Sequence, residues 1–216
     1  MGFQRNTKYY TGTVFEWSLP TGWTCPRALG CLVRVDRKTG KAENLSTDYK
    51  CYSASAERFP GVRESRWGNL ESQKKSGLPQ LPGKAHAVRV HPAGDFYSQA
   101  YFDAWIEYCE RYPDVDFWAY TKSVDLWINR MDSIPENLVL TASMGGQLDS
   151  AAVDHGLRTA TVVRASDPRA LSGPVDTNDD LARVRGPSFF LVNNSDERKA
   201  SKRRVLAYRE TARSHS

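Results

Sequence analysis

The sequence lacks several features that would place the protein in a membrane or outside the cell. No apolar run approaches the ~18 residues of a membrane-spanning helix, and the N-terminal stretch MGFQRNTKYYTGTVFEW has no apolar core of a secretory signal. Cysteine is scarce, with four in 216 residues. We therefore expect a cytoplasmic protein without membrane contacts, in which reduced cysteines bind a metal or stay inert and do not form disulfides.

Charge is the next constraint. The net charge is +5, and residues 195–216 hold seven basic and three acidic side chains, which gives +4 for this tail alone. Such a basic tail can contact nucleic acid, through residues 198–213, or an acidic partner. The alternative interpretation is a solvated, frayed chain end.

The remaining residues, 1–194, are expected to form a single α/β domain. Composition is ordinary for a globular protein, at 40% hydrophobic and 25% charged residues. A cysteine-bearing region, 18–72, is irregular and includes a hairpin or surface insertion over 34–50. Region 85–194 alternates short β-type runs with amphipathic helical stretches, which predicts a parallel sheet, open or curled into a partial (β/α) barrel. The expected strands are 86–90, 115–120, 137–143, 159–163 and 188–193, and the expected helices are 96–112, 123–131 and 145–156.

Polar residues follow the predicted strands, where reactive groups of such folds lie. We expect one rim to gather His91, Asp95, Tyr120, Lys122, Ser143 and Asn193. His91 and Asp95 are candidates for proton transfer, or Asp95 caps a helix and His91 bonds to a loop.

Lys122 is a candidate anion ligand or a member of a structural ion pair. Gly145 and Gly146 precede a helix, and with Ser143 they could hold a cofactor through backbone N–H groups. Their alternative role is a tight turn.

The cysteines divide into two groups. Cys25, Cys31 and Cys51 lie in the irregular region, with five and nineteen residues between them. Three thiolates can hold an iron–sulfur cluster or, with a histidine, zinc, and without an obvious fourth ligand they favour a four-iron cluster with one iron open. The competing interpretation is three unrelated thiols. Cys109 falls on the apolar face of a predicted helix, which indicates a packing role.

Three blocks of sequence resemble the phage Gene product 88 family: SLPTGWTCPRALGC, then CYSASAERFPGVRESRWGNLE, then VRVHPAGDFYSQAYFDAWIEYCERYPDVDFWAYTKS. The resemblance covers about residues 18–123 and implies a phage origin, with Cys25, Cys31 and Cys51 as the matching cysteines. It also suggests kinship with radical-SAM-like barrels, in which three cysteines hold a four-iron cluster that binds SAM. The spacing C-x3-C-x2-C and the tripeptide G-G-E are absent, so the sequence does not decide whether the protein is an enzyme.

Two functions follow from these expectations. The first is an iron–sulfur protein in the cytoplasm of the infected bacterium, which acts on or regulates a phage or host DNA transaction. If it is an enzyme, His91, Asp95, Tyr120 and Lys122 receive the substrate. The second is a non-enzymatic accessory protein that docks an integrase or replication protein with help from the basic tail, any metal being structural. Arg58, Arg63 and Arg66, after Cys51, could face phosphates or the cluster, but the default expectation is a solvated helix face.

Overall fold

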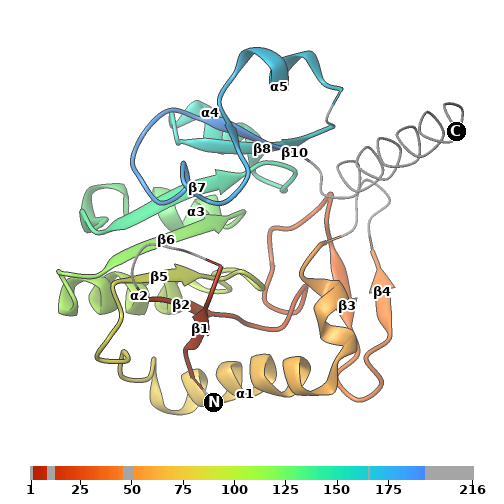
Figure 1. Cartoon of the computed structure of the whole chain (residues 1–216), viewed down its shortest axis with the longest axis vertical. Coiled ribbons are helices and arrows are strands. Elements are labelled where there is room, and N and C mark those ends of the chain that lie inside the picture. The colour runs from red at the N-terminus through yellow and green to blue at the C-terminus, as the bar shows by residue number, and fades with distance from the viewer. Residues whose placement is uncertain (1, 9–12, 46–50, 165, 193–216) are drawn as a thin grey trace, which may run out of the picture.

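The strands of the protein form one large sheet and one small hairpin. The computed structural model describes residues 2–8, 13–45, 51–164 and 166–192. In this part of the chain the strand order of the large sheet is β1-β2-β5-β6-β7-β8-β10-β9 (Figure 1). The large sheet contains β1 (Gln4–Asn6), β2 (Val14–Trp17), β5 (Ala87–Val90), β6 (Asp116–Thr121), β7 (Leu138–Ser143), β8 (Thr159–Val163), β9 (Val175–Asp176) and β10 (Phe189–Val192).

All neighbouring strands of this sheet are parallel except the first pair, in which β1 runs antiparallel to β2. From β2 through β5, β6, β7 and β8 to β10 each parallel strand lies beside the previous one. The short β9, which precedes β10 in the chain, lies beyond it at the edge of the sheet. The α/β class with a mostly parallel sheet is therefore confirmed. Among the described residues, no helix is long and apolar enough to cross a membrane.

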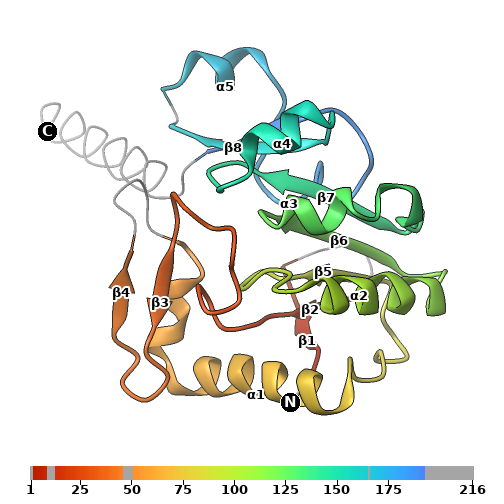
Figure 2. The ribbon, with the colours of Figure 1, turned by 180° about the vertical axis from the view of Figure 1, so that it is seen from behind.

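The helices cover one face of the sheet. Figure 2 brings α2, α3 and α4 to the front of the strands, with α1 along the β1 end. The helical elements are α1 (Pro60–Ser76), α2 (Gln99–Arg111), α3 (Val124–Ile128), α4 (Asp149–Asp154), α5 (Pro168–Ser172) and the 3-10 turns η1 (Ala54–Arg58) and η2 (Met131–Ser133).

The local sequence explains where the two long helices begin. Pro60 occupies the first turn of α1, where its missing N–H costs no helical bond. Ser98 caps α2 because its side chain accepts a hydrogen bond from the Tyr101 N–H at 3.3 Å. Both helices contribute to the main core, which lies between the sheet and its helices and is rich in aromatic rings, with Trp105 fully buried. Cys109 is also fully buried in this core, which confirms its packing role.

The opposite face of the sheet has a smaller core. Val14, Trp118 and Phe189 are buried there beneath Leu181 and Ala182, which belong to the segment after β9. The central strands thus alternate residues between two apolar layers, as expected for a sheet covered on both sides.

The predicted strands and helices of the second half are confirmed, and so is the hairpin, formed by β3 (Val33–Val35) and β4 (Ala42–Asn44). Sequence reasoning missed β2, the first strand of the parallel series. It is four residues long and follows a polar segment, so its sequence alone does not identify it as a strand. Its pairing with β5 does.

Candidate functional site at the carboxyl edge of the sheet

The loop that carries Cys25 and Cys31, residues 18–32, crosses the carboxyl edge of the parallel strands. It leaves β2, where the Leu19 N–H donates to the Ala93 carbonyl at 2.9 Å. It ends at the loop after β7, where the Gly30 N–H donates to the Gly145 carbonyl, also at 2.9 Å. We call this segment the cysteine loop, and it lies where α/β folds carry their ligands.

Gly94 permits the close passage of this loop. Its φ is +82°, and a Cβ atom at this position would lie 2.6 Å from Leu19 Cβ and 2.6 Å from Thr24 Oγ1. Any side chain there would collide with the cysteine loop, so glycine is required both by conformation and by space.

The three thiols of the cysteine-bearing region are close enough for their charges to interact. Burial raises the pKa of Cys25 well above its ordinary value, and the charges of Asp95, Cys51 and Cys31 raise it further, against a hydrogen bond from the Gly22 backbone. All three thiols are half-buried. Cys25 therefore holds its proton at neutral pH, because its surroundings are apolar and already negative.

A buried ion pair between Glu57 and Arg66 holds together the two segments that carry these thiols. Glu57 is fully buried, and its Oε1 accepts hydrogen bonds from Arg66 Nη1 at 2.6 Å and from the Thr21 N–H at 2.8 Å. Thr21 Oγ1 also lies 3.1 Å from Ser53 Oγ, which is itself 3.1 Å from Cys51 Sγ. One carboxylate thus ties the cysteine loop to the segment that carries Cys51.

The expectation of a solvated arginine face is wrong for two of its members. Arg63 and Arg66 are buried, and Arg63 Nη1 donates to the carbonyls of Glu57 and Arg58 at 2.7 and 2.9 Å. The physical reason is non-local: α1 packs against η1, which leaves backbone carbonyls and one carboxylate that need donors.

Asp95, Lys122 and Ser143 do converge at the strand ends. Asp95 Oδ1 accepts from Thr121 Oγ1 at 2.6 Å and from the Phe96 N–H at 2.7 Å, while Oδ2 accepts from the Lys122 N–H at 2.8 Å. Burial raises the pKa of Asp95 to about 6, and these three hydrogen bonds oppose that rise. Asp95 therefore joins the loop after β5 to the end of β6.

Lys122 extends this connection to β7. Its Nζ donates to the Ser143 carbonyl at 2.7 Å, to Ser143 Oγ at 3.0 Å and to the Met144 carbonyl at 2.6 Å. An ammonium has three protons to donate, so these contacts use all of them. The geometry favours a structural role for Lys122 over anion binding.

The backbone N–H groups of Gly145 and Gly146 also have a hydrogen-bond partner within the chain. The N–H groups of Gly145 and Gly146 donate to the two carboxylate oxygens of Asp149, at 2.7 and 2.9 Å. The pair therefore binds a carboxylate, as its backbone chemistry suggested, but that carboxylate comes from the same chain.

His91 packs among aromatic rings of the core, against Phe96, Tyr101 and Trp105. Its Nε2 lies 2.9 Å from the Tyr101 hydroxyl, which accepts a hydrogen bond from Trp17 Nε1 at 2.9 Å. Burial lowers the pKa of His91 to about 3, so the ring is neutral. His91 has φ +58°, an unusual conformation for a residue with a side chain.

Tyr120 lies on the other face of the sheet. Its hydroxyl donates to Asp179 Oδ1 at 3.3 Å, and Asp179 also pairs with Arg89 at 2.9 Å. Burial and the nearby carboxylate of Asp179 raise the pKa of Tyr120. His91 and Tyr120 thus form hydrogen bonds with Tyr101 and Asp179, not with Asp95, Lys122 or Ser143, and Asn193 lies outside the described residues.

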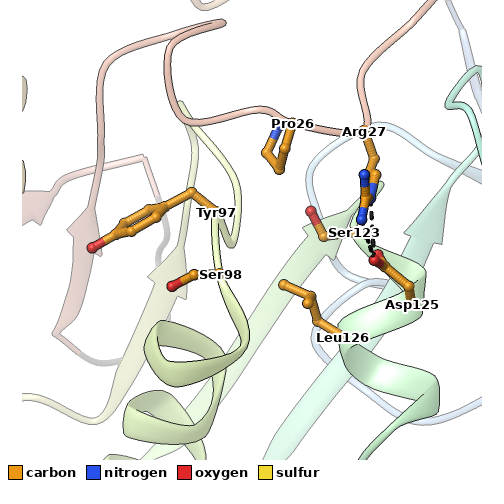
Figure 3. A pocket seen from close by; sticks show the side chains of 7 residues that line it. All are labelled: Pro26, Arg27, Tyr97, Ser98, Ser123, Asp125 and Leu126. Atoms are coloured by element: carbon orange, nitrogen blue, oxygen red, sulfur yellow. Dashed lines mark hydrogen bonds and ion pairs between the residues drawn. The ribbon is translucent and has the colours of Figure 1, made fainter.

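A pocket of about 300 Å3 opens beside the cysteine loop (Figure 3). It lies between this loop, the start of α2 and the start of α3, and sequence reasoning did not find it. Arg27 reaches from the loop to Asp125 of α3, and its Nη2 donates to Asp125 Oδ2 at 2.6 Å. The pocket is lined by Pro26, Arg27, Tyr97, Ser98, Ser123, Asp125 and Leu126.

The donor chemistry of the three thiols suits a soft metal or an iron–sulfur cluster. Their arrangement is not preformed, since the described residues contain no group of three or more His, Cys, Asp or Glu side chains placed to hold a metal ion. The site is thus three neighbouring thiols on two segments joined by Glu57.

The fold and site define an α/β protein with a thiol-bearing loop across the carboxyl edge of a parallel sheet. The chain belongs to the phage family Gene product 88, whose family model matches residues 1–210. No curated protein and no solved structure matches the chain. The family and phage origin indicated by the sequence are confirmed, and the basic tail, 195–216, lies outside the described residues.

Proposed function

We propose that this phage protein binds an iron–sulfur cluster through Cys25, Cys31 and Cys51. The observation that carries the proposal is the proximity of the three thiols: after burial and Asp95, the nearby Cys51 and Cys31 also raise the pKa of Cys25. Once Cys25 gives up its proton, three thiolates in this half-buried site repel one another, and bound iron compensates that repulsion. A cluster held by three cysteines leaves one iron without a protein ligand, and SAM is the candidate for that position.

The strand order supports the same assignment. Six parallel strands, β2, β5, β6, β7, β8 and β10, follow one another in the sheet, and β9 lies beyond β10 at the edge. Such a run is typical of a (β/α) barrel and differs from a doubly wound sheet with a central switch point. We propose that the sheet is a partial barrel of the radical-SAM-like kind, with the cysteine loop after its first strand. Asp95 and Lys122 act in it as positioning residues, which hold the ends of β5, β6 and β7 together under the loop.

Iron and acid-labile sulfide content of the anaerobically purified full chain tests this function. We expect a brown protein with thiolate-to-iron absorption, and each of Cys25→Ser, Cys31→Ser and Cys51→Ser should lose most of the iron. Cys109→Ala is the matched control, because this thiol is buried in the core and should not affect iron content. A colourless wild-type protein with sub-stoichiometric iron would refute the cluster.

Metal binding should also depend on pH in a defined direction. Because the Cys25 thiol is protonated in the metal-free protein, binding must release protons and strengthen as pH rises. Titration with Co2+ in weakly buffered solution measures both effects. For a protein that does carry a cluster, reductive cleavage of SAM under anaerobic conditions then distinguishes an enzyme from a protein with a structural cluster.

A further inference from the structure

The pocket beside the cysteine loop contains an ion pair with unused hydrogen-bonding capacity. Both bonds from Arg27 end on the same carboxylate oxygen of Asp125, from Nη2 at 2.6 Å and from Nε at 3.1 Å. The other oxygen, Oδ1, is buried and has no hydrogen-bond partner within the part of the chain that the structure describes. A buried carboxylate oxygen without a donor is costly, so this position favours a ligand that supplies one.

Separating Arg27 from Asp125 also requires little free energy. The side chains of Arg27 and Asp125 are 40% and 30% exposed, and pairs with such exposure are weak because water competes for both charges. Both groups can therefore exchange part of their mutual contact for contacts with a bound molecule.

The lining defines the chemistry of that molecule. A guanidinium recognises a carboxylate, and the unpartnered Asp125 oxygen accepts from an ammonium. Ser98 is the N-cap of α2 and already accepts from the Tyr101 N–H; the other N–H groups of a first helical turn have no helical partner and favour an anion. Pro26 and Leu126 add apolar side chains to the lining, from the cysteine loop and from α3 (Figure 3).

We infer that this pocket binds a free L-α-amino acid with a small apolar side chain. Arg27 and the start of α2 bind its carboxylate, Asp125 binds its ammonium, and Leu126 contacts its side chain. A volume of about 300 Å3 accommodates on the order of ten non-hydrogen atoms, and leucine has a number close to that. The inference is independent of the cluster, because none of the lining residues is a cysteine.

Binding of three amino acids to the purified full chain tests the inference. L-Leucine, L-isoleucine and L-valine are titrated by calorimetry and by thermal unfolding, and at least one should bind and raise Tm. The matched probes for leucine are 4-methylpentanoate, which lacks the ammonium, and 3-methylbutylamine, which lacks the carboxylate. Each should bind at least about tenfold more weakly, because each loses one charge-assisted contact.

Variants assign the binding to the pocket. Arg27→Met and Asp125→Asn should each weaken amino-acid binding by about tenfold or more. The matched control is Arg130→Met, which breaks a pair with Asp103 that has nearly the same length, 2.9 Å, and exposure, 39% and 31%, but lies outside the pocket. Absence of binding by all three amino acids, equal binding of 4-methylpentanoate, or an equal loss in Arg130→Met would overturn the inference.

Discussion

Replacement of Asp95 by asparagine isolates the energetics of the buried carboxylate under the cysteine loop. Burial raises the pKa of Asp95 to about 6 from 3.8, a difference equivalent to about 3 kcal/mol at 1.36 kcal/mol per pKa unit. Because the folded-state pKa is raised, the native protein binds more protons than the unfolded chain between these values. Stability from this group is therefore full below about pH 4 and is lost as pH rises through about 6.

The buried His91 acts in the opposite direction. Its pKa is lowered to about 3 from 6.5, so its contribution to stability is lost as pH falls below about 6.5. From about pH 4 to about pH 7 the two residues change the free energy of unfolding in opposite directions, and in the wild-type protein these two changes largely cancel. Asp95→Asn removes one of them and should leave a protein whose stability rises with pH.

Urea unfolding at a series of pH values measures the effect. The stability advantage of the wild type over Asp95→Asn should shrink by about 2 kcal/mol between about pH 4 and about pH 7. At all pH values the variant also loses the acceptor for the Lys122 N–H, at a cost of about 1–3 kcal/mol. The control Asp114→Asn changes an exposed aspartate, and its difference in free energy of unfolding from the wild type should not change with pH. If the difference for Asp95→Asn also does not change with pH, Asp95 does not titrate in this interval.

Four further outcomes are expected. Arg66→Leu leaves Glu57 buried without its cation and should lower the free energy of unfolding by about 3–5 kcal/mol, measured by urea denaturation; a loss below about 1 kcal/mol contradicts the assigned role. Lys122→Met removes three hydrogen bonds to the end of β7 and should cost about 2 kcal/mol or more, whereas an unchanged Tm argues against the connection. NMR of His91 should show a neutral ring down to about pH 5, and a titration midpoint near 6.5 would contradict its burial. Iodoacetamide should alkylate Cys25 in the metal-free native protein more slowly than free cysteine at neutral pH, because its thiolate is scarce, and faster alkylation is the contrary result.

Part of the candidate site could be predicted from the sequence. Parallel strands place their carboxyl ends at one edge, so the meeting of Asp95, Lys122 and Ser143 follows from the order of strands and loops. The grouping of three cysteines follows from motif resemblance. Neither argument says what each polar atom binds, because that depends on carbonyls and carboxylates brought in from other segments.

The sequence by itself determined most of the β/α half of the protein, apart from the short α5 and β9, because helical and strand periodicities are local properties of the chain. Cys109 is an example, since its place on the apolar face of α2 made it a core residue. The tertiary structure decided the rest: β2 exists through its pairing with β5, Arg66 is buried because Glu57 is, and Arg27 meets Asp125 from a distant segment. These contacts join residues far apart in the chain, and only the packing of the cysteine loop across the sheet edge brings them together.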